Sequence, residues 1–255
     1  MGMNNGLHPK LKTPEEIKIM AEGGVKLRRV KNALAKAVKA GVSSLDIENL
    51  AKKLIAEEGA EGSFDKVPGY RWLTCISVNE QLVHGIPKKE TVFKDGDVVS
   101  VDVGIYYKGF HTDTSTTVGI NLTPDSSKFL EIGRRALNAA IAEVKPGRHI
   151  FDISEAIQDI IEGAGYSPIR ALVGHGVGRE LHEEPQIPCF VPRASGRGEQ
   201  IVPGMALAIE VMYAKGGSEV GLLPDGWTIA MRDGKISALF EETVAVTPRG
   251  HQVLT

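Results

Sequence analysis

Residues 97–118 read DVVSVDVGIYYKGFHTDTSTTV, and this stretch predicts the hairpin around which the rest of the chain is arranged. The run from Val98 to Val103 is rich in β-branched residues, as in a buried strand. Lys108-Gly109 is typical of a tight turn, because glycine readily adopts positive φ. A second strand is expected from Phe110 to Val118. Asp102 interrupts the first strand, and a carboxylate in an apolar site needs a cation or several donors to compensate its charge.

A two-residue turn would make the numbers of opposed residues sum to 217, so that Gly104 lies opposite Asp113. Asp102 shares the face of Gly104, because side chains alternate along a strand. Asp102 and Asp113 would then be diagonal neighbours, with Cβ atoms roughly 7 Å apart. That spacing suits ligands of two metal ions about 3.5–4 Å apart. A bulge would break this register, and the hairpin alone leaves open that Asp113 starts an Asx or Ser/Thr turn while Asp102 is exposed at an edge.

Composition narrows the class of protein. The 255 residues are enough for one large domain or two fused halves. A formal charge of −2, from 30 basic and 32 acidic residues, gives no long-range attraction to nucleic acid or to a membrane. Cys75 and Cys189 form no C-x-x-C motif, which favours a reducing compartment. Without an apolar signal region or a run that could span a bilayer, we expect a soluble cytoplasmic protein.

The order of the local signals predicts a flexible leader over residues 1–12 and a single domain over 13–255, with halves at about 13–120 and 121–250. Thr13 to Glu16 form a capping box with proline at the first helical position. The expected helices run from Thr13 to about Ala40, from Ser43 or Ser44 to Gly59, from Thr123 to about Val144, and from about Asp152 to Glu162. The further expected strands cover residues 74–78, 205–213, 227–231 and 238–246.

The two halves carry matching motifs. At an offset of 106 residues, VKAG at 38–41 matches VKPG at 144–147. At an offset of 108, Asp102 falls on Glu210, and both acids lie inside apolar strands. Amphipathic helices look alike by chance, but an acid placed twice inside a buried strand is a rarer coincidence. We interpret the pattern as an internal duplication of a helix–helix–strand unit about a pseudo-two-fold axis, and not as a solenoid.

A set of five residues points to a metal site. Glu210 lies in ALAIEV at 206–211, Glu241 lies in ALFEETV at 238–244, and His175 is flanked by glycines. Together with Asp102 and Asp113 they offer four carboxylates and one imidazole. This set is too rich in oxygen for structural zinc and favours Mn²⁺, Fe²⁺ or Co²⁺. Five ligands suit two ions that share bridging carboxylates. Each residue alone could instead be a surface acid or a core histidine, but that reading is poor for all five together.

In order along the chain, these residues and His84 resemble type I methionine aminopeptidase, a metallopeptidase of the pita-bread fold. The resemblance covers the chain from Thr13 onward. The motifs that carry it are CISVNEQLVHGIP at 75–87, KDGDVVSVDVG at 94–104, GFHTDTS at 109–115, GHGVGRELHEEPQ at 174–186 and DGWT at 225–228. The implied fold is α+β, with pseudo-two-fold duplicated halves and a curved antiparallel sheet backed by helices, forming one catalytic domain.

The resemblance also implies roles for individual residues. Two divalent ions (Co²⁺, Mn²⁺, Fe²⁺ or Zn²⁺) would be held by Asp102, Asp113, His175, Glu210 and Glu241, with Asp113 and Glu241 bridging. Glu210 would also shuttle a proton. His84 and His182 would bond the scissile amide and the tetrahedral intermediate.

The methionine side chain would lie among Tyr70, Cys75, Leu181 and Trp227. The backbone near Asn79 and Ser237 would hold a monovalent cation, as in some relatives. Leu181 replaces a phenylalanine found in many relatives, and Val211 replaces a proline. We expect these two departures to change the shape of the pocket and not its chemistry.

The implied activity is removal of the N-terminal methionine from nascent proteins and peptides, with preference for a small second residue. The sequence itself is silent on ribosome contact and oligomeric state, for which the family suggests the ribosome as a partner and a monomer. No direct binding to nucleic acid and no membrane are expected. One alternative is a proline-specific peptidase of the same fold, which usually carries a large additional N-terminal domain. The other is a non-catalytic pita-bread binding protein, which would have lost metal ligands that this chain retains.

Overall fold

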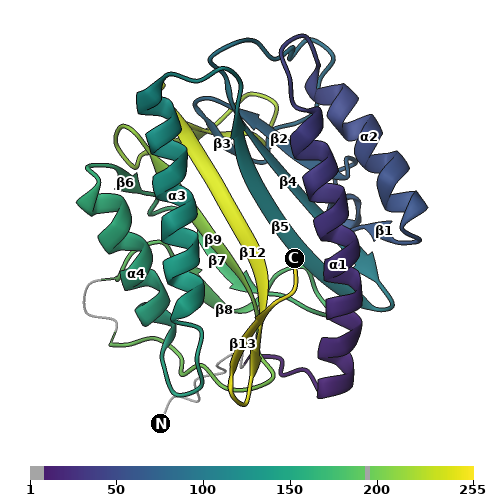
Figure 1. The fold of residues 1–255 in the computed structure, drawn as a ribbon, viewed down its shortest axis with the longest axis vertical. Coiled ribbons are helices and arrows are strands. Elements are labelled where there is room, and N and C mark those ends of the chain that lie inside the picture. The colour runs from purple at the N-terminus through teal and green to yellow at the C-terminus, as the bar shows by residue number, and fades with distance from the viewer. Residues whose placement is uncertain (1–8, 193–195) are drawn as a thin grey trace.

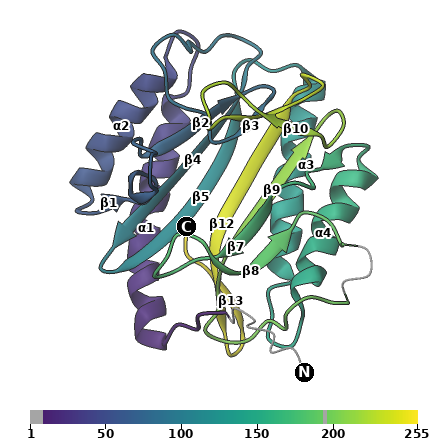
Figure 2. The same ribbon diagram turned by 180° about the vertical axis from the view of Figure 1, so that it is seen from behind.

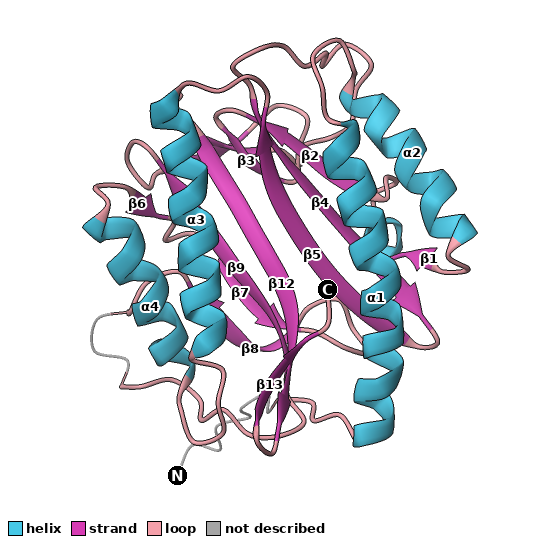
Figure 3. Ribbon diagram, viewed as in Figure 1, coloured by secondary structure: helices cyan, strands magenta, loops and turns pink. Residues whose placement is uncertain are grey.

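Four helices cover one face of a curved antiparallel sheet (Figure 1, Figure 3). The computed structural model describes residues 9–192 and 196–255, and residues 1–8 of the expected leader lie outside this range. The helices are α1 (Pro14–Ala37), α2 (Ser44–Glu57), α3 (Pro124–Ala142) and α4 (Ile150–Gly163), and Phe64–Lys66 form a short 3-10 turn. This arrangement confirms the predicted α+β class.

Ten strands form the main sheet within the described residues, along the path β1-β4-β5-β12-β9-β7-β8, with β2, β6 and β13 pairing with β4, β9 and β12. Their bounds are β1 (Glu61–Gly62), β2 (Thr74–Val78), β4 (Val98–Tyr107), β5 (Phe110–Gly119), β6 (Ser167–Pro168), β7 (Val173–Gly176), β8 (Glu183–Pro188), β9 (Ala206–Ala214), β12 (Ser237–Thr247) and β13 (Gly250–Val253). A smaller sheet pairs β10 (Val220–Leu222), β11 (Ile229–Met231) and β3 (Gln81–Val83). Figure 2 shows the main sheet from the face that the helices leave open.

The β4–β5 hairpin has the predicted register. Gly104 lies opposite Asp113, and the pairing continues without a bulge along both strands. Lys108 and Gly109 have φ angles of 48° and 91°. Positive φ at both central residues is the requirement of a type I′ turn, whose twist matches that of the strands it joins. The short turn therefore determines which side chains of the two strands are neighbours.

Corresponding parts of the two halves make the same backbone contacts. Ser43 caps α2 and forms an isolated antiparallel bridge with Val92, while His149 caps α4 and forms one with Gln200. The two bridges are related by the offsets of 106 and 108 residues that relate the sequence motifs. The helix–helix–strand unit is thus repeated, with β5 and β12 adjacent at the centre of the sheet.

Each half packs its own apolar core between helices and sheet. In the first half Leu34 of α1 and Ile47 of α2 pack with Val101 of β4. In the second half Phe129 of α3 and Ile153 of α4 belong to a cluster that includes β9 and β12. Full burial of each such side chain contributes about 1.5–3 kcal/mol. Because alternate residues of the central strands face the helices, the residues between them project from the open face.

Several helix ends differ from the predicted ones, and α2 and α3 each end two residues earlier than predicted, at Glu57 and Ala142. α1 ends at Ala37 instead of about Ala40, because the next residue has an extended backbone. α4 begins at Ile150, two residues ahead of the predicted start at about Asp152, because His149 is the N-cap and its N–H donates a hydrogen bond to the Asp152 carboxylate. In the described part of the chain no helix combines the length and the apolar character needed to cross a membrane.

Candidate active site

Five side chains form one row across the open face of the sheet. The row follows the register pairs Cys75–Asp102, Asp102–Ser115, Ser115–Glu241 and Glu241–Glu210, on β2, β4, β5, β12 and β9. Opposed residues on neighbouring strands project to the same face. Three of the predicted metal ligands therefore share a single line of side chains.

The other two predicted ligands lie in the adjacent row. Asp113 is opposite Gly104, and His175 is opposite Ala208. Thr243 of β12 lies between these two positions: it pairs with Ala208, and its hydroxyl accepts a hydrogen bond from the N–H of Asp113 at 2.9 Å. Small residues are needed between the ligands. A Cβ on Gly104 would lie 3.0 Å from the Phe64 ring and 3.2 Å from the Asp113 carboxylate, so only glycine fits this position without displacing its neighbours.

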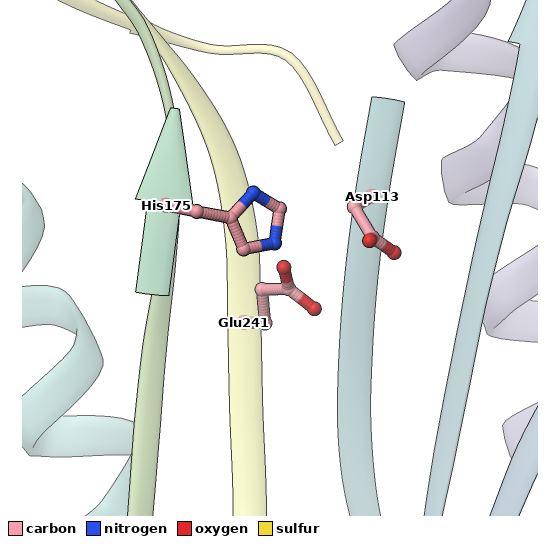
Figure 4. Close-up of side chains that lie close together, drawn as sticks. All are labelled: Asp113, His175 and Glu241. Atoms are coloured by element: carbon pink, nitrogen blue, oxygen red, sulfur yellow. The ribbon is translucent and has the colours of Figure 1, made fainter. Parts of the chain in front are cut away.

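Side chains from three strands converge where the two rows meet (Figure 4). One candidate ligand atom from each of Asp113, His175 and Glu241 lies within 4.8 Å of the others. Glu210 is adjacent, with Oε1 3.5 Å from Nε2 of His175. Nδ1 of His175 lies 2.8 Å from the carbonyl oxygen of Gly176. A carbonyl can only accept, so Nδ1 carries the proton and the Nε2 lone pair is free to bind a metal.

The charge of this cluster calls for a cation. Burial raises the pKa of Asp113 to about 7. Burial and the charge of Asp113 raise the pKa values of Asp102, Glu210 and Glu241 well above their usual range. Among the described residues, nothing donates a hydrogen bond to the buried Oδ1 of Asp102 or Oε1 of Glu241. Unpaired buried carboxylate oxygens are costly, and a divalent ion would compensate them. The residues present therefore fit a divalent metal site.

A cavity of about 210 Å³ connects these ligands to a pocket walled by apolar and aromatic side chains. All the residues predicted for catalysis, metal binding and the side-chain pocket line this one cavity. Phe64, Val67 and Val83 line it as well, and sequence reasoning missed them. Phe64 and Val67 lie in a segment read only as a loop, with no motif to distinguish them from other apolar residues.

Tyr70 and Trp227 form the aromatic wall of the pocket. Their ring centroids are 5.0 Å apart in an edge-to-face arrangement. The Tyr70 hydroxyl donates to the carbonyl of Thr74 at 2.8 Å, next to Cys75. A strand was predicted over residues 227–231, but β11 begins only at Ile229 and Trp227 lies outside it. The N–H of Trp227 donates instead to the carboxylate of Asp225 in a turn.

A buried acid that no sequence motif distinguishes, Glu48, holds this wall in place. Glu48 on α2 is fully buried and accepts hydrogen bonds from the N–H groups of Leu73 and Thr74 and from the Thr74 hydroxyl. The equivalent residue in the second half is Ser154, whose hydroxyl faces the carbonyl of Ile150 in its own helix. The anchor is therefore confined to the half that carries the pocket wall.

His84 and His182 lie at the boundary between the ligands and the pocket. The ring centroids of His175 and His182 are 4.5 Å apart. Burial lowers the pKa values of both His84 and His182, so each is a neutral imidazole near pH 7 and can donate one hydrogen bond. His84 has a φ of 56°, an uncommon backbone conformation for a residue with a side chain. Such local strain occurs most often at functional sites.

The sequence pattern of metallopeptidase family M24 matches residues 18–248. A Bacillus subtilis protein named methionine aminopeptidase 1 is 42% identical over 245 residues, which are 96% of this chain and 98% of that protein. The crystal structure of methionine aminopeptidase from Thermotoga maritima superimposes with a TM-score of 0.94 at 39% identity, over 97% of this chain and 99% of the other. A prolidase from Pyrococcus furiosus has the same fold, with a TM-score of 0.76 at 24% identity over 96% of this chain and 65% of its own.

Proposed function

Because the chain belongs to metallopeptidase family M24, we infer that it acts as a methionine aminopeptidase, a hydrolase that removes the N-terminal methionine from peptides. The observation that carries this conclusion is the single cavity in which a cluster of buried carboxylates adjoins an aromatic pocket. The polarizable thioether of methionine packs favourably against aromatic rings such as Tyr70 and Trp227. Binding the first side chain in this pocket would bring the first peptide bond to the cluster.

The group of Asp113, His175 and Glu241 and the unpaired carboxylate oxygens support a divalent metal cofactor. For this cofactor we propose two ions, drawn from Co²⁺, Mn²⁺, Fe²⁺ and Zn²⁺. We assign Asp102 to one ion, His175 and Glu210 to the other, and Asp113 and Glu241 as the shared ligands. When bound, such ions lower the pKa of water and polarise the carbonyl that is to be attacked. A monovalent cation near the backbone of Asn79 and Ser237 is a further proposal, which comes from the resemblance to relatives alone.

Protein groups around the reacting bond perform the remaining steps. Glu210, at the edge of the cluster, would take the proton released when water attacks and pass it to the leaving amine. His84 and His182 would donate hydrogen bonds to the scissile amide and to the oxygen of the tetrahedral intermediate. Leu181, beside His182, would complete the pocket together with Cys75.

We extend the proposal to the cellular substrate and setting. The enzyme would act as a monomer on the N termini of nascent proteins at the ribosome, in the cytoplasm. One fact supports part of this: both cysteines are buried free thiols, as expected in a reducing compartment. A crowded metal site would admit only small second residues.

The test compares two activities on one preparation. The protein loaded with Mn²⁺ is incubated with Met-Ala-Ser and, separately, with an Ala-Pro dipeptide, and the released amino acids are quantified. Methionine release alone is expected. Cleavage of the Ala-Pro bond in its place would identify a proline-specific peptidase. A protein that retains no metal by elemental analysis and cleaves neither peptide would be a non-catalytic binding protein, contrary to the proposal.

A further inference from the structure

The segment that leads into α1 is tied by ion pairs to the loop that carries His182. This segment, residues 10–16, is here called the N-terminal strap. The three ion pairs between the strap and residues 179–183 are Lys10–Glu180, Lys12–Glu183 and Glu16–Arg179. The expected flexible leader therefore does not extend to Lys12, whose N–H also donates to the carbonyl of Gly204 at 2.7 Å.

One of these pairs is buried and the others are not. Nζ of Lys12 lies 2.6 Å from Oε2 of Glu183, with side-chain exposures of 2% and 0%. The Lys10–Glu180 pair has the same 2.6 Å separation, with exposures of 45% and 64%. Removing two charges from water costs about as much as their attraction returns, so a buried pair is weak support for stability as such. The buried pair matters instead for its position, next to the loop that carries His182.

The Lys12–Glu183 pair closes the loop that presents His182 to the cavity. Oε1 of Glu183 accepts the N–H of Glu180 at 3.1 Å, so the same carboxylate bonds both the strap and the start of the loop. The end of the Lys12 side chain packs directly against Gly178, where a Cβ atom would collide with it. His182 is the residue before Glu183, and it lines the cavity with its ring against His175.

We propose that Lys12 is a positioning residue for His182, which acts by holding Glu183 and thereby the backbone that orients the imidazole. The inference rests on the proposed function of His182 as a hydrogen-bond donor to the substrate. Lys12 itself touches no substrate. Its effect on catalysis should therefore disappear when the His182 imidazole is absent.

The experiment is a double-mutant cycle on the metal-loaded enzyme with Met-Ala-Ser as substrate. Lys12→Met, His182→Ala and the combination of both are compared with the parent. A misplacement of about 1 Å can lower turnover about 100-fold, so Lys12→Met should reduce kcat by up to that factor. In the His182→Ala background the same substitution should cause no further loss, because coupled residues are non-additive. Lys12→Arg should recover most of the activity, and metal content should stay unchanged throughout.

Lys10→Met is the matched control, because it removes an exposed pair between the same strap and the same loop. Its kcat should equal that of the parent. Should Lys12→Met fold poorly, Lys12→Met combined with Glu183→Gln removes both charges and is measured in its place.

Equal losses in the two backgrounds, or a lowered Tm with unchanged kcat, would overturn the positioning role. Full activity of His182→Ala would instead overturn the proposed function of His182, and the positioning role with it. The two failures are therefore distinguishable.

Discussion

Asp102 and Glu210 occupy equivalent positions in the two halves of the chain and stand at opposite ends of one four-residue line across β4, β5, β12 and β9. Ser115 and Glu241 lie between them, on the two central strands. The first half thus supplies Asp102 and Asp113, and the second supplies His175, Glu210 and Glu241. Loss of a ligand at the end of the line should differ from loss of one at the centre.

Asp102→Ala and Asp113→Ala are expected to behave differently. Removing Asp102 takes both oxygens from one proposed ion, so about one tightly held ion per chain should remain out of a two-metal site. Removing Asp113 weakens both ions, and the remaining carboxylates then repel or take up protons. Asp113→Ala should hold less metal and melt at a lower temperature. Calorimetric metal titration and melting curves in Mn²⁺ and in chelator measure this. Identical behaviour would show that the bridging assignment is mistaken.

His84→Ala and His182→Ala should lower turnover and leave metal content intact. Each would remove one neutral donor aimed at the developing negative charge. Such a loss typically costs about 2.7–4 kcal/mol of transition-state stabilisation. Steady-state kinetics together with elemental analysis of the same samples test the assignment. If either variant emerged without metal, the histidine would be a ligand and not a donor.

The second residue of the substrate should limit the rate. Met-Ala and Met-Gly peptides should be cleaved efficiently, whereas Met-Lys and Met-Leu peptides should be poor substrates, because a pocket for one unbranched side chain beside a crowded metal site would leave little room for the second side chain. The measurement is kcat/KM for the four peptides under the same metal loading. Comparable values for all four would contradict a crowded site.

The metal-free protein should become less stable as the pH rises above about 4 and through the raised folded pKa values of its buried carboxyls, about 7 for Asp113. The folded protein raises the pKa of Asp113 to about 7 and those of the other three carboxyls well above their usual range, so it binds more protons than the unfolded chain. That stabilisation is complete at low pH and is lost as pH rises through the folded values. The lowered pKa of His175, about 3, acts in the opposite direction only below the unfolded value near 6.5.

Melting curves in chelator and in excess Mn²⁺ across this range test the pH dependence. The decline should be present in chelator and absent in Mn²⁺, where the ions compensate the carboxylates. Asp113→Asn, which cannot ionise, is the control and should show a shallower decline in chelator. Parallel curves with and without metal would place the destabilising groups elsewhere.

Glu48→Ala should weaken methionine binding although Glu48 lies outside the cavity. The substitution leaves the donors of Leu73 and Thr74 without their partner, at about 1–3 kcal/mol for each buried group. The segment that carries Tyr70 and Cys75 would then loosen, so KM should rise while metal content is unchanged. Ser154→Ala, the equivalent change in the other half, is the control and should leave KM unaltered. A rise in KM for both variants would indicate a general effect on folding.

The strongest features of the site could be predicted because they are local. A two-residue Lys-Gly turn sets the hairpin register, and that register makes Asp102 and Asp113 neighbours. An acid inside an apolar strand is equally visible in the sequence, which is how Glu210 and Glu241 were found. Only the resemblance to a family could assign His84 and His182 to the substrate, because a lone histidine in a loop has no periodicity to interpret.

Features that depend on contacts between distant segments were not predictable. No local pattern indicates that β5 lies beside β12, and therefore that Ser115 separates Asp102 from Glu241. Lys12 was assigned to the leader, because its partner Glu183 is far away in the sequence. Phe64 and Val67 line the cavity from the segment before Leu73 and Thr74, the two residues whose N–H groups Glu48 holds.

The pairing of Ser115 with Glu241 at the centre of the sheet has a historical consequence. These residues come from the central strands of the two halves, and the proposed metal ligands lie on both sides of that junction. A half-length ancestor could have assembled such a cluster only by associating with a second copy of itself, and identical subunits would have supplied identical ligands. Fusion of two such genes would free each copy to diverge, which would account for a histidine and two glutamates in the cluster from one half and two aspartates from the other.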